Sequence, residues 1–402
     1  MTSIAVLSMH TSPLAQPGMG DSGGMNVYVR ELVASLAQAG VDSSVFVRRW
    51  RDDLPDVVEV EPGFRVVHVD AGPSDLAKED LPSVVDAFAA GVRRHLDAGP
   101  AVAALHANYW LSGLAAHRLK HELSLPLVTT FHTLARVKAE YGDHEPAHRE
   151  EGEAEIIGCA DVMLASCRTE VEQLVDHYGA DPSRIEIVAP GVDHAFFSPG
   201  DRRGARQAVG LGDHPVLLFV GRIQPLKRLD VAIRALAALD DRTAELVVVG
   251  GPSGAEGDGE MVDVLVLIDA LGVADRVRFV PPQPHHLLST WYRAADVVVV
   301  PSRSESFGLV ALEAAACGTP VVAAAVGGLT TLVDDGRTGF LVDDADPATY
   351  AARIAAILAD PVLAFDLRQA SAEKAAGYTW STTAGRLRRL YADLGARSLV
   401  RC

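Results

Sequence analysis

The sequence predicts an α/β protein with two doubly wound parallel sheets, each forming a Rossmann-like domain. Short β-branched runs alternate with helical segments along the whole chain, which is the pattern of such sheets. The 402 residues suit two or three domains. A segment rich in Pro and Gly at about 190–200 separates two series of strands. We therefore expect an N-terminal domain over 1–195 and a C-terminal domain over 196–380.

The first series of apolar runs predicts the strands of the N-terminal sheet. A helix with one apolar face is expected over Met25–Gln38, and Gly40 would end it. The expected strands are Ile4–Met9, Val45–Val47, Phe64–Val69, Ala103–His106, Leu127–Thr130, Ala160–Ala165 and Ile185–Val188.

The second series predicts the strands Val216–Val220, Leu246–Val249, Val277–Phe279, Val297–Val300 and Pro320–Ala325. Helices are expected over Pro347–Leu358 and Thr382–Leu394. Asp344-Ala-Asp346 has the D-x-D form of some metal-nucleotide sites. Because Asp346-Pro347 opens a helix, we interpret it as a capping turn.

The stretch Asp296–Gly328 predicts a βαβ unit that places two glutamates near a ligand. A helix is expected from about Phe307 to Ala316, with Ser306 as its cap. Ligands of such sheets bind beyond the carboxyl ends of the strands. Glu305 precedes this helix and Glu313 lies inside it.

Glu313 stands in a helix that is otherwise almost entirely apolar. A solvated helix face is one interpretation. The other is a buried carboxylate, which needs a hydrogen-bonding partner that a hydroxyl-rich ligand would supply. The first amides of the helix, at about Phe307–Leu309, would form an anion site for a diphosphate. These features favour a nucleotide-sugar site.

Arg222 and Lys227 follow the strand Val216–Val220 in the segment GRIQPLK. They are either surface charges or a clamp on a diphosphate leaving group, whose developing charge an Arg fork and a Lys ammonium would stabilise. We favour the clamp.

The loop after the first strand is rich in Gly and Pro and contains Gly18-x-Gly20-x-x-Gly23. This spacing matches a dinucleotide fingerprint, but it begins well after the strand, and the second strand ends in Arg48-Arg49 without the expected acid. A flexible lid whose Gly23-Gly24 approaches a phosphate is the favoured interpretation.

Polar groups also follow the expected strands of the N-terminal domain, at His10, in the segment His106–Trp110 and at His132-Thr133. Each histidine alone is more often structural, but three at one sheet edge indicate a binding site. The charge-dense segment Arg136–Glu155 by itself is equally consistent with a solvated loop.

Composition argues against several partners. The net charge of −17 disfavours nucleic acid and anionic membranes. The chain shows no signal peptide and no run of transmembrane length, so we expect no membrane insertion and a cytoplasmic location. The cysteines show neither metal-type spacing nor a disulfide framework, and we expect small core residues plus one tail thiol. They are Cys159, Cys167, Cys317 and Cys402.

The E-x7-E spacing of Glu305 and Glu313 resembles the signature of retaining glycosyltransferases with the two-domain GT-B fold. Six further segments resemble the inositol-phosphate glycosyltransferases of mycothiol biosynthesis, and sucrose-phosphate synthases share most of them. They are HTSPLAQPGMGDSGGMNVYV, YWLSG, FHTLARVK, VGRIQPLK, YRAADVVVVPS and GTPVVAAAVGGL. The resemblance covers essentially the whole chain. It implies two Rossmann-like domains facing a central cleft, with the last helix, in 381–402, joined to the first domain.

The resemblance implies UDP-N-acetylglucosamine as the donor and no organic cofactor. It implies catalytic roles for Arg222, Lys227, His132 and Glu305. The implied donor site consists of Gln16, Pro17, Gly24, Arg222, Lys227, Gln283, Glu305, Ser306, Phe307, Gly308, Leu309 and Glu313. A structural Mg²⁺ ion is implied near Tyr292, Arg293, Ala295 and Thr319. A homodimer stays open.

The implied acceptor is a phosphorylated cyclitol such as 1D-myo-inositol 3-phosphate. Its site would consist of His10, Asp21, Ser22, Gly23, Gly24, Met25, Asn26, Lys78, Tyr109, Thr133 and Arg149. Lys78, Tyr109, Thr133 and Arg149 would meet the phosphate. The sequence departs from the family in Asn108 for His, Arg228 for Gly, Gln283 for Arg, and a shorter loop between Lys138 and Arg149. The first and last departures leave a sugar phosphate open as the acceptor.

A double displacement with retention needs a carboxylate nucleophile. Asp21 is the only acid among the ligand-facing loops of the first domain, and the resemblance directs it at the acceptor. We therefore expect front-face attack by the acceptor hydroxyl. The rival classes are an NAD(P)-dependent oxidoreductase and a catalytically idle binder of nucleotide sugars.

Overall fold

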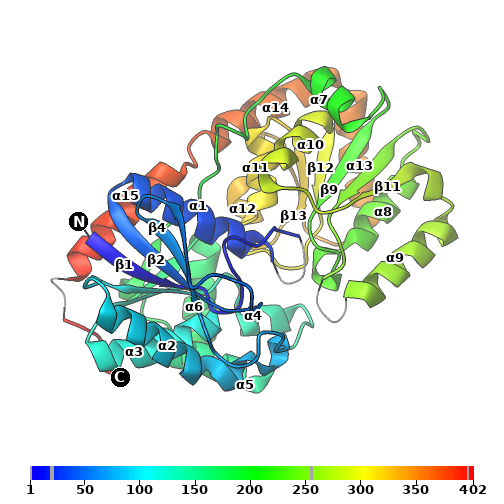
Figure 1. Cartoon of the computed structure of the whole chain (residues 1–402). Helices are drawn as coiled ribbons and strands as arrows, with labels where there is room; N and C mark the ends of the chain where they lie inside the picture. Colours follow the sequence, from blue (N-terminus) through cyan, green and yellow to red (C-terminus); the bar gives the residue numbers. More distant parts are fainter. Residues whose placement is uncertain (1, 19–21, 254–256, 396–397) are drawn as a thin grey trace. The chain divides into compact units, whose positions relative to one another are not determined.

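A computed structural model describes residues 2–18, 22–253, 257–395 and 398–402 (Figure 1). The chain forms two compact units. Unit 1 comprises Met1–Ala15, Met25–Gly191 and Trp380–Cys402, and unit 2 comprises Gln16–Gly24 and Val192–Thr379. The segment Gln16–Gly24 thus groups with unit 2, although it follows the first strand of unit 1. The domain limits expected from the sequence stay a prediction.

Unit 1 contains an eight-stranded sheet in the order β3-β4-β2-β1-β5-β6-β7-β8. Its strands are parallel except β3, which pairs antiparallel to β4. The sequence patterns did not predict β3, which is an exposed edge strand without a long apolar run. The strands are β1 Thr2–Leu7, β2 Val41–Arg48, β3 Val57–Glu61, β4 Phe64–Val69, β5 Leu105–Asn108, β6 Leu127–Thr130, β7 Val162–Ala165 and β8 Ile185–Ile187.

Helices cover both faces of this sheet, and the alternation of side chains along each strand assigns the two cores. Ile4 and Val6 of β1 pack in one core with α1 and α15. Ala5 and Leu7 pack in the other with α2, α3 and α5. The helices are α1 Gly24–Gln38, η1 Lys78–Val84, α2 Val85–Ala98, α3 Trp110–Leu123, α4 Ala135–Glu140, α5 Ala147–Cys159, α6 Arg168–Tyr178, η2 Pro182–Arg184 and α15 Trp380–Leu394.

Unit 2 contains a six-stranded parallel sheet in the order β11-β10-β9-β12-β13-β14. Its strands are β9 Val216–Val220, β10 Glu245–Val249, β11 Val277–Val280, β12 Val297–Val300, β13 Val321–Ala324 and β14 Gly339–Val342. The helices are α7 Arg202–Val209, η3 Pro225–Lys227, α8 Leu229–Ala238, α9 Gly257–Leu271, η4 Ala274–Arg276, η5 His285–Leu287, α10 Leu288–Ala294, α11 Leu309–Ala316, α12 Leu329–Leu332, α13 Pro347–Ala359 and α14 Pro361–Ala375. Both sheets confirm the predicted doubly wound α/β class.

Two helix starts test the capping predictions. Asp346 accepts hydrogen bonds from the amides of Ala348 and Thr349, which confirms the capping turn. The prediction for Ser306 is wrong, because α11 begins at Leu309 and its N-cap is Gly308, with a φ of 98°. Only glycine adopts this backbone conformation without strain, so the helix starts two residues later than expected.

The cysteine prediction is also wrong. Cys159 and Cys402 form a disulfide, while Cys167 and Cys317 are buried and lie outside it. The bonded residues are 243 positions apart in the sequence, so their spacing carried no local signal.

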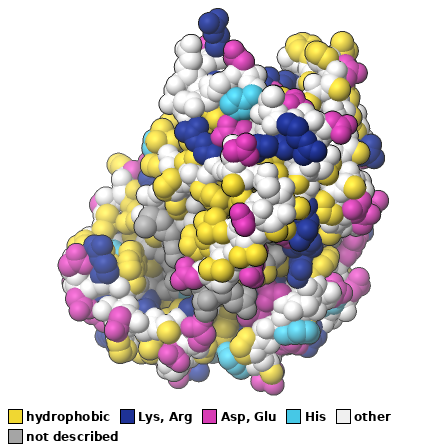
Figure 2. All heavy atoms as spheres, turned by 90° about the vertical axis from the view of Figure 1, so that its right-hand side faces the viewer, with side chains coloured by type: hydrophobic (Ala, Val, Ile, Leu, Met, Phe, Trp, Pro, Cys, Tyr) yellow, Lys and Arg dark blue, Asp and Glu magenta, His cyan; other side chains and the backbone are white. Residues whose placement is uncertain are grey.

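On the face in Figure 2, acidic and basic side chains are intermixed with hydrophobic ones, and no continuous basic area is visible among the described residues. Among these residues, no single helix has the length and apolar composition to cross a membrane. The helices α13 and α14 meet that test only as a pair bent by 101°.

Candidate active site

The sheet of unit 2 reverses its strand order between β9 and β12. From β9 the chain continues outward to β10 and β11, while β12 leads to β13 and β14 in the opposite direction. A crevice forms at such a switch point, beyond the carboxyl ends of the strands. The loop after β9 carries Arg222 and Lys227, and the loop after β12 carries Glu305.

These two loops are joined by an ion pair. Lys227 Nζ donates to Glu305 Oε2 at 2.6 Å, and both side chains are partly buried. The amide of Arg303 also donates to the carbonyl oxygen of Leu226 at 2.9 Å. Arg222 reaches Ser253 Oγ at 3.4 Å from the same side of the loop. The structure therefore pairs Lys227 with Glu305, and Arg222 lies on the same loop as Lys227, bonded to Ser253.

Glu313 is only 5% exposed, so it does not lie on a solvated helix face. Its Oε1 lies 2.7 Å from His285 Nε2, and its Oε2 accepts from the Tyr292 hydroxyl at 2.8 Å. Burial, and then the Glu313 charge, raise the pKa of Tyr292, which keeps the hydroxyl a donor. The protein itself thus supplies partners that we had expected from a ligand. Sequence reasoning missed His285, although it follows β11 at the same sheet edge.

The double glycine of the AVGGL segment allows close packing beneath Glu305. A Cβ added to Gly327 would lie 1.8 Å from the Glu305 carbonyl oxygen, and one added to Gly328 would lie 2.3 Å from the Phe307 Cα. The Gly328 amide donates to the Glu305 carbonyl at 3.0 Å. Two side-chain-free residues are therefore required where this loop crosses the turn after β13.

The described parts of the glycine-rich segment contact loops of unit 2. Gln16 Nε2 donates to the Pro282 carbonyl at 3.0 Å, and Gln283 donates to the Pro281 carbonyl at 2.8 Å. A Cβ on Gly23 would lie 3.3 Å from Arg222 Nε. This segment does not lead directly from β1 into a helix, as a dinucleotide fingerprint would. The predictions for Gly20 and Asp21 lie outside the described residues.

The residues expected around Mg²⁺ fit that ion poorly. The Tyr292 carbonyl accepts from the Thr319 hydroxyl at 2.7 Å, and the Ala295 carbonyl accepts from Arg368 at 3.2 Å. Arg293 is bonded to the Ser198 carbonyl at 2.7 Å. The four predicted residues offer no carboxylate, and two guanidinium groups lie beside them, whereas Mg²⁺ prefers anionic oxygen ligands.

The sheet of unit 1 has its own switch point, between β1 and β5. The rings of His10 after β1 and Tyr109 after β5 lie 4.4 Å apart. Tyr109 has a φ of 73°, and His132 after β6 has a φ of 63°. Non-glycine residues rarely adopt positive φ, and such strain concentrates at functional sites.

His132 is held by the residue that replaces the usual family histidine. Its Nε2 lies 2.8 Å from Asn108 Oδ1, and its ring meets that of Tyr28 edge to face at 4.9 Å. Burial, with a smaller contribution from His106, lowers the pKa of His132 to about 3. Its imidazole is therefore neutral at physiological pH.

Arg149 is almost fully buried and is bonded through three nitrogens. Nε donates to Glu153 at 2.9 Å, Nη1 to Glu145 at 2.7 Å and Nη2 to Thr133 Oγ1 at 2.9 Å. Its guanidinium also stacks on the Tyr109 ring at 4.9 Å. Burial alone would lower the pKa of Arg149, but Tyr109, Glu153 and Glu145 together raise it.

The charged segment before α5 is thus an ordered ion network and not a solvated loop. Lys138 pairs with both Asp143 and Glu145, and Glu153 also accepts from the Tyr178 hydroxyl and the Ala135 amide. Arg149 was predicted from the sequence as a residue of the acceptor site, whereas Glu145 and Glu153 were not predicted. Their i,i+4 spacing from Arg149 was the available signal.

The other residues of the expected acceptor site differ in exposure. Asn26 is buried and donates to Thr11 Oγ1 and to the Ser12 carbonyl, which holds the loop after β1. Ser22 is buried, whereas Lys78 at the start of η1 and Thr133 are exposed. The structure therefore brings Tyr109, Thr133 and Arg149 into contact, with His10 against Tyr109.

Two family descriptions match the two halves of the chain. Glycosyltransferase Family 4 matches residues 22–196, and Glycosyl transferases group 1 matches residues 201–377. Sucrose-phosphate synthase from Thermosynechococcus elongatus superposes with a TM-score of 0.93 at 32% identity, over 99% of this chain and all of that one. With two doubly wound units and these matches over both halves of the chain, the protein is a glycosyltransferase of the GT-B fold.

Curated relatives with high sequence identity indicate the family within this class of glycosyltransferases. The chain is 48% identical to D-inositol 3-phosphate glycosyltransferase 2 of Catenulispora acidiphila over 98% of this chain and 95% of that protein. It is 49% identical to the D-inositol 3-phosphate glycosyltransferase of Frankia alni over 95% of this chain and 97% of that protein. The chain belongs to the same family as these glycosyltransferases.

Proposed function

We propose that the protein is a retaining glycosyltransferase that transfers N-acetylglucosamine from UDP-N-acetylglucosamine to 1D-myo-inositol 3-phosphate. The observation that carries this proposal is the near-full-length identity of 46–49% to relatives named for that acceptor. The clusters at the two switch points supply the chemistry that such a transfer needs.

Arg222 and Lys227 bind the diphosphate of the donor and stabilise the charge that develops as the sugar leaves. The pairing of Lys227 with Glu305 holds the ammonium in place before the donor binds. Glu313 keeps acceptor capacity on both carboxylate oxygens for ribose hydroxyls, while Tyr292 and His285 fix its position. Gln16, Pro17 and Gln283 lie beside the base, and the residues from Ser306 to Leu309 lie beside the phosphates.

Tyr109, Thr133, Arg149 and Lys78 bind the phosphate of the acceptor, and His10 and Asn26 bind its ring hydroxyls. Because three nitrogens of Arg149 are engaged, the phosphate displaces Glu145, which is the more exposed of its two carboxylate partners. Glu145 keeps Lys138 as a partner after this exchange. Before the acceptor binds, the guanidinium of Arg149 is thus neutralised by its ion pair with Glu145.

The acceptor hydroxyl attacks the front face of the anomeric carbon. His132 orients the donor sugar and does not take the proton, since its low pKa makes it a weak base. The proton passes to the departing diphosphate or to the phosphate of the acceptor. Positioning and stabilisation of the leaving group then supply most of the rate.

A donor-by-acceptor screen with product mass spectrometry tests the substrates, and NMR of the anomeric proton tests retention. We expect the highest kcat/KM with UDP-N-acetylglucosamine and 1D-myo-inositol 3-phosphate. A higher kcat/KM with a hexose phosphate would overturn the proposed inositol-phosphate acceptor. It would favour an activity like that of sucrose-phosphate synthases. An inverted product would overturn the front-face mechanism. If the protein bound a nucleotide sugar tightly but turned over no donor–acceptor pair, it would be a catalytically idle binder of nucleotide sugars.

A further inference from the structure

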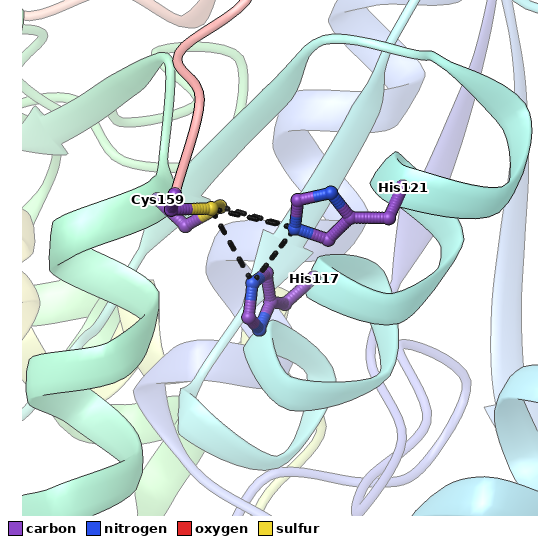
Figure 3. A group of neighbouring side chains, drawn as sticks. His117, His121 and Cys159 are labelled. Carbon is purple, nitrogen blue, oxygen red and sulfur yellow. Dashed lines mark hydrogen bonds between the residues drawn. A yellow bond between two sulfur atoms is a disulfide. The ribbon is translucent and has the colours of Figure 1, made fainter.

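Two histidines and two cysteines converge at the end of unit 1 where α3 and α5 finish (Figure 3). His117 and His121 lie one turn apart on α3, Cys159 is the last residue of α5, and Cys402 belongs to the C-terminal tail. One donor atom from each residue lies within 4.8 Å of all the others. No residue expected in the donor or acceptor site belongs to this group.

The N–N and N–S distances between the donor atoms are close to the edges of a tetrahedron, whereas the two sulfurs are bonded to each other and must separate before a metal can bind. The two Nε2 atoms are 3.1 Å apart. Cys402 Sγ lies 3.7 Å from His117 Nε2 and 3.3 Å from His121 Nε2, and Cys159 Sγ lies 3.5 Å from His121 Nε2. Zinc bonds of about 2.0–2.1 Å to nitrogen and about 2.3 Å to sulfur, at tetrahedral angles, separate N–N and N–S pairs by about 3.3–3.6 Å.

The residues behind these donors support the same arrangement. Glu155 lies 2.8 Å from His117 Nδ1, so a proton on Nδ1 leaves the Nε2 lone pair directed at the sulfurs. Metal-binding histidines commonly have such a carboxylate partner. The tail that carries Cys402 is anchored separately, because the Val400 amide donates to Asp161 at 2.7 Å. Asp161 in turn pairs with the buried Lys120.

We propose that His117, His121, Cys159 and Cys402 form a Cys₂His₂ site for a structural Zn²⁺ ion. All four positions are filled by protein, as in structural zinc sites, and imidazole with thiolate in a tetrahedral set selects zinc. The metal site and the Cys159–Cys402 disulfide exclude each other, since the metal needs both sulfurs as thiolates. A thiol reductant transfers two electrons to the disulfide and becomes a disulfide itself, and both cysteine protons leave as Zn²⁺ binds.

The proposed site lies at the far ends of two helices that begin near the expected acceptor site. Helix α3 starts directly after Tyr109, and helix α5 starts at Ala147, two residues before Arg149. Both helices end at the proposed metal site. A metal bound there fixes the far ends of the two helices and holds the tail against them. Loss of the metal is therefore expected to lower the free energy of unfolding more than it lowers kcat.

The experiment uses the full chain, purified under a thiol reductant and dialysed against Zn²⁺ or Co²⁺. Bound zinc is measured by elemental analysis, and bound Co²⁺ by its thiolate charge-transfer and tetrahedral ligand-field absorption. The variants are H121A and C402S, and the controls are H95A, which changes an exposed histidine, and C167A, which changes a buried cysteine outside the disulfide.

We expect one equivalent of zinc in the native chain and in both controls, and tetrahedral thiolate absorption with Co²⁺. Both site variants should lose these signals while keeping their far-ultraviolet circular dichroism. Zinc should also raise the melting temperature of the reduced native chain but not that of H121A. A reduced, folded native chain that binds neither metal would overturn the proposal, and so would equal zinc content in C402S and native protein.

Discussion

Lys227 and Glu305 show how one contact joins two loops that are far apart in the sequence. The ammonium and the carboxylate come from opposite sides of the switch point and lie 2.6 Å apart. Since both side chains are partly buried, water screens the pair less than at an open surface. In the donor site that we propose, a diphosphate would meet a cation that is already oriented.

Replacing Lys227 or Arg222 by alanine should lower kcat by roughly 10²-fold or more, because a charge contact made in the transition state is lost. The fold should persist, since both residues lie on a loop. Steady-state kinetics and melting curves are compared with Arg337→Ala, which removes an exposed cation from a distant turn. Near-native kcat in folded Lys227→Ala protein would refute the clamp.

Replacing Arg149 has two effects that must be separated. Arg149→Ala leaves Glu153, which is fully buried, without its cation, and breaking a buried pair costs about 3–5 kcal/mol of stability. The double variant Arg149→Met/Glu153→Gln removes both charges and should regain most of that loss. Chemical denaturation of the two variants measures the difference.

In that double variant the effect on the acceptor should remain. We expect kcat/KM for the phosphorylated acceptor to fall by about 10- to 100-fold, the equivalent of one charge-assisted hydrogen bond. Binding of UDP, measured by calorimetry, should stay near native. Unchanged kinetics, together with equal activity on the unphosphorylated acceptor, would refute a phosphate site at Arg149.

At the scale of single elements, two buried features affect a loop of unit 2 and a helix of unit 1. The turn after β13 packs directly under the Glu305 loop, and the first turn of α6 buries Glu170, which accepts from the Ser166 amide at 2.6 Å. The packing under the Glu305 loop is a steric constraint that a glycine substitution tests. The buried Glu170 carboxyl is an electrostatic feature that the pH dependence of stability tests.

Gly328→Ala should displace the Glu305 loop, because its Cβ would meet backbone atoms that cannot move independently. We expect a stability loss of about 1–3 kcal/mol, as for other overpacked sites, and a lower kcat. Gly385→Ala in α15 is the matched control. Its Cβ meets no atom within 4 Å, so it should stabilise the helix by about 0.5–1 kcal/mol. Equal stability of the two variants would contradict the close packing.

Glu170 should make stability depend on pH. Burial raises the pKa of this carboxyl to about 7 from the usual 4.5. Its favourable contribution is complete below pH 4.5 and is lost as pH rises through 7, because ionisation is disfavoured only in the folded state. Between pH 5 and pH 8, the free energy of unfolding measured by denaturation should therefore fall by about 2.5 kcal/mol more in the native protein than in Glu170→Gln. Parallel profiles would contradict the raised pKa.

At the scale of the whole molecule, the chain passes between the two units at both ends of Gln16–Gly24, near Gly191–Val192 and near Thr379–Trp380. The last two passages join the main parts of the units. These passages are adjacent, since Val192 pairs with Thr379 and its amide donates to the Tyr378 carbonyl at 3.2 Å. Segments of this kind can absorb a relative rotation while each sheet stays intact. The donor and acceptor sets we propose belong to different units, so we predict that a relative motion of the units accompanies donor binding.

Binding of UDP should therefore make the protein more compact. We expect the radius of gyration from small-angle scattering to decrease at saturating UDP, because enclosing the donor excludes water from the reaction. Lys227→Ala should need more UDP for the same decrease. An unchanged scattering profile at saturating nucleotide would contradict closure.

The sequence by itself determined the α/β class, nearly all the strands of both sheets and the two glutamates of the βαβ unit. Strands Phe64–Val69, Leu127–Thr130, Val216–Val220 and Val297–Val300 have the predicted limits. These features depend on apolar runs and on turn residues within a few positions of each other. The strands β3, in which glutamates interrupt the valines, and β14, a short strand that begins with a glycine, were missed.

Only the tertiary structure decided which groups meet. It gave Glu313 its protein partners, enclosed Arg149 between two carboxylates and brought Cys402 to Cys159 and the two histidines of α3. Strand order and helix packing set these contacts, and the residues involved are often hundreds of positions apart. Local periodicity specifies which face of an element is buried, but not which distant side chain lies against it, because that depends on how all the elements pack together.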